Sequence, residues 1–211
     1  MKTDELIRLL SEDAPVRMRY RRALAAAIVF GAVAAVSLLL STYGLRPDLA
    51  DQIETLRVAF KIGASLLAAV LACRLVLRIG RPGLSVRGAA LSLLVPLGLL
   101  VLAVAAELVV LPQADWMPKL LGRNATFCLV LVPTLSFLPL VALLWAMRNG
   151  APDNPGLAGA AAGIAAGAIG ATVYALHCPD DSPLFVATWY PLAIAIVTIA
   201  GYGAGRRALR W

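Results

Sequence analysis

The sequence predicts an all-α integral membrane protein with six transmembrane helices, both termini in the cytoplasm, and a short N-terminal amphipathic helix. Three observations predict this class. The 211 residues are 61% hydrophobic, whereas soluble domains contain about 45–50% apolar residues. Six apolar runs each approach the roughly 20 residues that a helix needs to cross a bilayer. The basic residues, which give the chain a net charge of +7, flank these runs.

The first 22 residues are polar and predict a cytoplasmic segment that contains a short helix. Thr3 can cap this helix, and Asp4 suits the positive end of its dipole. An apolar face then follows with helical spacing, made of Leu6, Ile7, Leu9 and Leu10. Such a short helix is marginal alone in water. It should bury its leucines on a partner, or else on the membrane surface or the protein's own loops.

Residues 23–211 form the predicted transmembrane domain. Its spans cover about residues 23–43, 58–77, 89–111, 125–147, 157–176 and 188–205. The second span carries Lys61 close to its outer end, where snorkelling would let the ammonium group reach an interface. Glu107 lies near the outer end of the third span and is a candidate partner for Lys61.

The distribution of Lys and Arg predicts the orientation. With a cytoplasmic N-terminus, 14 of the 19 basic residues fall in cytoplasmic segments and five fall outside. This asymmetry satisfies the positive-inside rule. The last outer loop then contains the stretch "YALHCPDDSPLF". Cys178 in this loop and Cys128 share the oxidising side, whereas Cys73 faces the reducing cytoplasm.

Three chemistries are open to Cys128 and Cys178. Residue types alone rank a static disulfide first, a reversible redox switch second and soft-metal capture third. A transient heavy-metal ion would use thiolates and imidazole, with Cys128, His177, Cys178 and Asp180 as candidate ligands. A protonated His177 would also lower the thiol pKa of its neighbour Cys178. No resident cofactor is implied.

The fifth span contains glycines at four-residue spacing, Gly159, Gly163 and Gly167. Small residues at this spacing let helices approach closely. We expect close packing inside the monomer, with a homo-oligomer seam as the alternative.

The chain contains no P-loop, nucleotide fingerprint, H-E-x-x-H motif or serine elbow, so we expect no enzyme. Its basic excess is explained by membrane orientation, and we expect no direct contact with nucleic acid. A small transporter or ion-handling protein that uses Glu107 and Lys61 is the main alternative. A membrane thiol oxidoreductase is disfavoured because no C-x-x-C motif occurs.

The opening "MKTDELIRLL", the six spans and the late "LHCPDDSP" resemble the NrsF family of bacterial inner-membrane anti-sigma factors. The resemblance covers nearly the whole chain. It implies that the chain holds an extracytoplasmic-function sigma factor inactive at the inner membrane through its cytoplasmic N-terminus. It also implies that two periplasmic-side cysteines, by position Cys128 and Cys178, respond to heavy-metal or oxidative stress. The resemblance therefore favours the switch over the static disulfide, and it assigns no role to Cys73.

Overall fold

The computed structural model describes residues 16–210, and within this range all regular structure is helical. The helices are α2 (Val16–Thr42), α3 (Leu49–Gln52), α4 (Leu56–Ile79), α5 (Arg87–Ser92), α6 (Leu94–Val110), the 3-10 helix η1 (Gln113–Asp115), α7 (Trp116–Leu121), α8 (Ala125–Met147), α9 (Pro155–Ala175) and α10 (Pro183–Ala208). Six helical segments are long and apolar enough to cross a membrane, which confirms the predicted number. The predicted N-terminal helix lies outside the described residues, and so do the six residues predicted to bind a partner there, Thr3, Asp4, Leu6, Ile7, Leu9 and Leu10.

Two spans differ from their predicted bounds for local reasons. Helix α2 begins at Val16, inside the segment predicted to be separate, because no proline or glycine interrupts the chain from there to Phe30. The third span is divided into α5 and α6 at Leu93. Pro96 lacks the N–H that would bond to the carbonyl four residues earlier, which accounts for this break.

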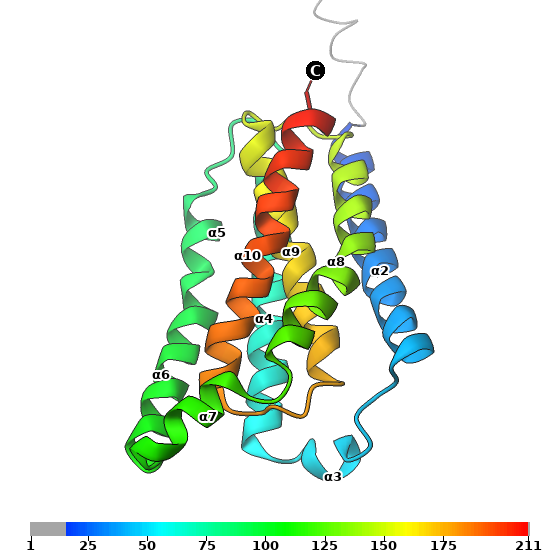
Figure 1. Ribbon diagram of the computed structural model, residues 1–211. Coiled ribbons are helices and arrows are strands. Elements are labelled where there is room, and N and C mark those ends of the chain that lie inside the picture. The colour runs from blue at the N-terminus through cyan, green and yellow to red at the C-terminus, as the bar shows by residue number, and fades with distance from the viewer. Residues whose placement is uncertain (1–15, 211) are drawn as a thin grey trace, which may run out of the picture.

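Helix α9 is the central element of the bundle. Most of its residues are buried, and it packs against α2, α4, α8 and α10. Figure 1 shows α2 and the α5–α6 segment at opposite edges of the molecule. The start of α2 and the end of α10 lie together at one end, here called the termini end. The opposite end, which holds α3, α7 and the loop between α9 and α10, is called the clamp end.

The glycines of α9 bring α10 into backbone contact. A Cβ atom added at Gly163 would lie 2.6 Å from Thr198 Cα, and one added at Gly205 would lie 2.6 Å from Gly159 Cα. The expectation of close packing inside the monomer is therefore confirmed. Gly159, Gly163 and Gly167 are all buried against α10, so the alternative of an oligomer seam through these glycines is wrong.

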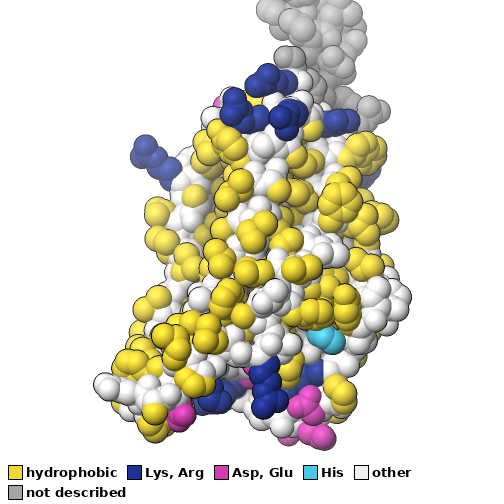
Figure 2. Space-filling model, viewed as in Figure 1, with side chains coloured by type: hydrophobic (Ala, Val, Ile, Leu, Met, Phe, Trp, Pro, Cys, Tyr) yellow, Lys and Arg dark blue, Asp and Glu magenta, His cyan; other side chains and the backbone are white. Residues whose placement is uncertain are grey.

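Charged side chains are sorted between the two ends. Figure 2 shows Lys and Arg as the main charged side chains at the termini end, whereas the clamp end carries most of the visible Asp and Glu together with further Lys and Arg. Asp153, in the loop between α8 and α9, is the only carboxylate in residues 16–210 that belongs to the termini end. The face shown in Figure 2 is mostly apolar between the two ends, which is typical of helices that cross a bilayer.

The close contact of α9 and α10 predicts a sharp difference between two glycines. Gly163→Ala should destabilise the protein by about 1–3 kcal/mol, because the added methyl group overpacks a backbone contact. Gly203→Ala is the control, since a Cβ atom there would meet nothing within 4 Å. Thermal unfolding of the purified protein in detergent should show a lower Tm for Gly163→Ala alone. Equal Tm values would contradict the packing described here.

Candidate functional site

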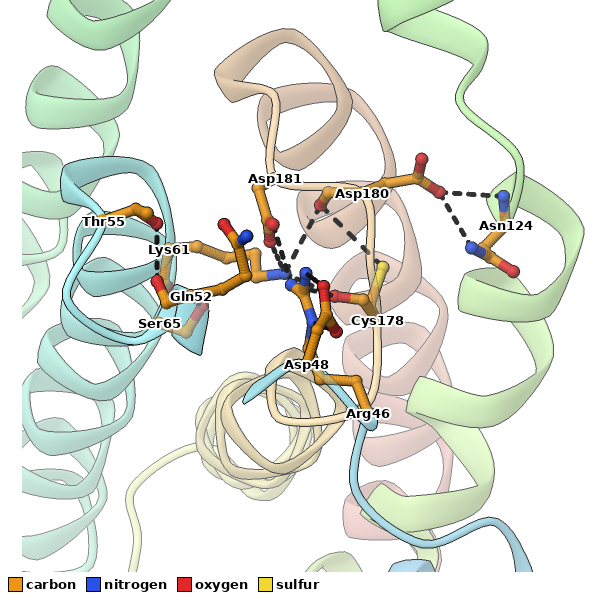
Figure 3. A network of polar contacts seen from close by, with 10 residues as sticks. All are labelled: Arg46, Asp48, Gln52, Thr55, Lys61, Ser65, Asn124, Cys178, Asp180 and Asp181. Carbon is orange, nitrogen blue, oxygen red and sulfur yellow. Dashed lines mark hydrogen bonds and ion pairs between the residues drawn. The ribbon is translucent and has the colours of Figure 1, made fainter. Parts of the chain in front are cut away.

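The loop between α9 and α10, residues 176–182, is the polar hub of the clamp end. We call it the clamp loop. Figure 3 shows side chains from the α2–α3 region, α4 and the start of α8 converging on it. It contains the predicted reactive residue Cys178 and the neighbouring acids Asp180 and Asp181. The polar groups of the loop together contact several parts of the bundle.

Asp181 forms ion pairs with two cations. The Lys61 ammonium group is fully buried and forms an ion pair with Asp181 Oδ1. Arg46 Nη1 donates to Asp181 Oδ2 at 2.7 Å. Lys61 also donates to the carbonyl of Cys178 at 2.7 Å. A buried charge is tolerated only when it is paired and hydrogen-bonded, and both conditions are met here.

Arg46 extends this network to Asp48. Its Nε and Nη2 atoms donate to the two carboxylate oxygens of Asp48, at 2.7 Å and 2.8 Å. This bidentate geometry is the strong form of a charge-assisted pair. Hydrogen bonding by Arg46 lowers the pKa of Asp48, and hydrogen bonding by Asp48 raises the pKa of Arg46. The stabilisation from Asp48 is thus present above the ordinary carboxyl pKa and is lost as the pH falls through the lowered value.

Asp180 serves the start of α8. Its Oδ2 atom accepts from the backbone N–H groups of Asn124 and Arg123, at 2.9 Å and 3.1 Å, and from Asn124 Nδ2 at 3.0 Å. Asn124 itself makes no side-chain cap at this helix start. An anion is favoured at a helix N-terminus, where backbone donors lack partners. Asp180 therefore ties the clamp loop to α8.

Glu107 serves the start of α10. Its Oε2 atom accepts from Ser182 Oγ at 2.7 Å and from the backbone N–H of Leu184 at 3.1 Å. Arg57 Nη2 lies 3.5 Å from Oε1. The expected pair between Glu107 and Lys61 is therefore wrong, as is snorkelling of Lys61. Lys61 is enclosed by the clamp loop, whose carboxylate and carbonyl oxygens satisfy it in place of water.

Cys128 and Cys178 share one buried apolar cluster. Both are free thiols without exposed surface, and the cluster also includes Tyr174, Phe185 and Tyr190. Cys73 is half-buried and packs against the other two clusters of the bundle. The structure thus brings together the two cysteines that the charge distribution assigned to one side, and keeps the third apart.

Burial lowers the reactivity of the Cys178 thiol. It raises the pKa of the Cys178 thiol, while the nearby Lys61 acts in the opposite direction. The thiol is therefore mostly protonated at neutral pH, and the thiolate is the reactive form. His177 does not activate it. The ring of His177 faces away, with Nδ1 at 3.0 Å from the carbonyl oxygen of Gly44, and packs beside Tyr43 and Phe127.

The four predicted metal ligands are not assembled in this structure. Between residues 16 and 210, no three His, Cys, Asp or Glu side chains are grouped so that they could hold a metal ion. His177 is directed to Gly44, and the Asp180 carboxylate is used by the start of α8. Capture of a metal by Cys128, His177, Cys178 and Asp180 together would require the clamp loop to move.

Several residues of this site were not found from the sequence. Arg46 and Asp48 were not singled out, the ion-pair role of Asp181 was missed, and Lys61 was assigned the wrong partner. One signal was available, since a lysine and an arginine beside apolar runs need anions and two adjacent aspartates occur in one outer loop. Nothing in the spacing along the chain says which aspartate faces which cation.

Comparison with known proteins identifies the family. The NrsF family, described as "Negative regulator of sigma F", matches residues 9–211. The chain belongs to the NrsF family. It is 37% identical to the anti-sigma-F factor NrsF of Caulobacter vibrioides and 34% identical to the probable anti-sigma-F factor NrsF of Azospira oryzae. Both alignments cover the full length of both chains. No solved structure matches the chain.

Membership of the NrsF family makes the function regulatory rather than catalytic, and it implies a sigma factor as partner. The sequence-based resemblance to NrsF is confirmed, as is the expectation that the chain is not an enzyme. The pair on which the transport alternative was based, Glu107 with Lys61, is not formed.

The ion-pair network predicts a large effect from a small change at Asp181. Asp181→Asn should destabilise the protein by about 3–5 kcal/mol, because Lys61 would remain buried without its anion. Loosening of the clamp loop should also speed alkylation of Cys178 by a maleimide. Lys119→Met is the control, since Lys119 is exposed and forms no ion pair among residues 16–210. If Tm and the alkylation rate are unchanged in Asp181→Asn, the ion pairs of Asp181 do not hold the clamp loop in place.

Proposed function

We propose that this NrsF-family protein holds an extracytoplasmic-function sigma factor inactive at the bacterial inner membrane. Heavy-metal or oxidative stress, sensed by Cys128 and Cys178 on the periplasmic side, releases the sigma factor. The observation that carries the sensing proposal is the position of these free thiols. Cys178 belongs to the clamp loop, and Cys128 is buried in the same cluster. The clamp loop connects α9–α10 with four other parts of the bundle.

The proposed membrane topology is supported by shape and charge. Six apolar helical segments can cross a bilayer, and an even number returns the chain to its starting side. The termini end carries most of the positive charge (Figure 2), which favours the cytoplasmic face. The clamp end, with both sensor thiols, then faces the periplasm, where cysteine oxidation is permitted.

The proposed switch acts through close packing. Interiors packed at crystal-like density do not accept an added oxygen, metal ion or thiol adduct without rearrangement. Modification of the Cys178 side chain would shift the same residue whose carbonyl accepts from Lys61. A ligand can shift the balance between two packings only through its different affinity for them. Metal–thiolate bonds are strong enough to supply that difference.

The proposed output is the N-terminal segment. Thr3 and Asp4 would begin its helix, and the apolar face would bind the sigma factor through Leu6, Ile7, Leu9 and Leu10. Helix α2 begins at Val16, at the termini end. The N-terminal segment is therefore attached on the proposed cytoplasmic side, which is where a sigma factor is found.

The binding proposal predicts that Leu6→Asp or Leu10→Asp switches on the sigma-dependent genes without stress. A carboxylate in the apolar face would have to be buried without a partner. Leu6→Met, which keeps the apolar face, is the control and should repress normally. The readout is a transcriptional reporter together with immunoblots of the membrane fraction. Silent genes at normal protein levels would show that the sigma factor binds elsewhere.

The sensing proposal predicts that Cys128→Ser combined with Cys178→Ser abolishes induction by a heavy-metal salt or an oxidant. Basal repression should persist, because the N-terminal segment is intact. Cys73→Ser is the matched control, since Cys73 lies outside the cluster of the other two cysteines. Normal induction in the double variant would eliminate the thiol pair as the sensor.

A further inference from the structure

Tyr20 is the anchor of α2 at the termini end. It is 3% exposed and lies one turn after the start of the helix, ten residues along the chain from Leu10. Its hydroxyl group donates to the carbonyl of Val76 in the last turn of α4, at 2.9 Å. The same carbonyl accepts a longer bond from the backbone N–H of Gly80, at 3.4 Å, so the Tyr20 hydroxyl makes the shorter of its two hydrogen bonds.

The ring of Tyr20 fits between two glycines from separate loops. A Cβ atom at Gly80, after α4, would lie 2.5 Å from Tyr20 Cζ, and one at Gly150, after α8, would lie 2.9 Å from Tyr20 Cε2. The two loops are joined by a hydrogen bond from the N–H of Ala151 to the carbonyl of Gly80, at 3.2 Å. Tyr20 therefore occupies a socket, made by Gly80 and Gly150, that no larger residue could form.

The socket and the clamp loop are attached to the same two helices. Past its clamp-end terminus, α2 continues into Gly44 and Arg46, which contact the clamp loop. Helix α4 supplies Lys61 to the clamp loop and Val76 to Tyr20. Between these ends α2 packs mainly on α8, at the edge of the bundle (Figure 1). Each terminus of α2 is thus held by a polar contact.

We propose that Tyr20 is a positioning residue for sigma-factor binding. It fixes the start of α2, from which the N-terminal segment continues along the chain, against the α4–α5 and α8–α9 loops. A fixed attachment point for a binding segment reduces the conformational entropy that is lost on association. This inference rests on the proposed function, because it concerns the affinity of the segment proposed to bind the sigma factor. Tyr20 itself contacts α4 and the socket.

The test measures binding of the sigma factor that co-purifies with the full chain. The full-length protein is placed in nanodiscs, and the Kd is expressed per folded molecule. Tyr20→Phe keeps the ring but loses the hydrogen bond to Val76, and should weaken binding about two- to tenfold. Gly150→Ala should weaken it too, because the added methyl group would lie 2.7 Å from the Gly80 carbonyl oxygen and 2.9 Å from Tyr20 Cε2, so the socket must open. The alkylation rate of Cys178 should stay unchanged in both variants.

Gly163→Ala separates positioning from simple loss of stability. It destabilises the α9–α10 contact, where the added methyl group would meet Thr198 and Val197, and should leave the Kd per folded molecule unchanged. If Tyr20→Phe and Gly150→Ala also bind with the parental Kd, Tyr20 is only structural and the inference is wrong. Leu6→Asp is measured in parallel. If it retains the parental Kd, the proposed function fails, whereas loss of binding in Leu6→Asp alone overturns only the role of Tyr20.

Discussion

The arrangement of the clamp end depends on one constraint, the burial of the Lys61 ammonium group. An unpaired buried charge costs several kcal/mol, so the surrounding chain must supply an anion and further acceptors. Asp181 and the Cys178 carbonyl do so, and Arg46 shares Asp181 with Lys61. Helices in a bilayer gain little from hydrophobic association, so such polar contacts have a large share in setting their relative positions.

The clamp loop that surrounds Lys61 also keeps the Cys128 and Cys178 thiols away from solvent. A typical redox-sensing cysteine is exposed and has a low pKa. Cys178 is instead enclosed, and burial raises its thiol pKa. Its own carbonyl accepts from Lys61, so the side chain that would react and the backbone that holds the loop belong to one residue. In the proposed switch, a thiol adduct and an intact clamp therefore compete for the same space.

The rest of the bundle separates rigid from peripheral elements. Helix α9 and the glycine-mediated contact with α10 form a dense centre, which leaves little freedom there. Helix α2 lies at the edge, is continuous from Val16 to Thr42, and is anchored at one end by Tyr20 and beyond the other by Arg46. A continuous helix held at its ends can carry a displacement from the clamp end to the N-terminal segment.

The sequence by itself determined the six apolar segments, the sorting of charge between two ends and the placement of Cys128 and Cys178 on one side. These properties follow from composition and from distance along the chain. Only the tertiary structure decided that Asp181 pairs with Lys61, that Glu107 caps α10, that His177 turns to Gly44 and that α10 covers the glycines of α9. The physical reason is that each of these contacts depends on which helix faces meet, and linear spacing does not specify how separate helices are rotated against one another.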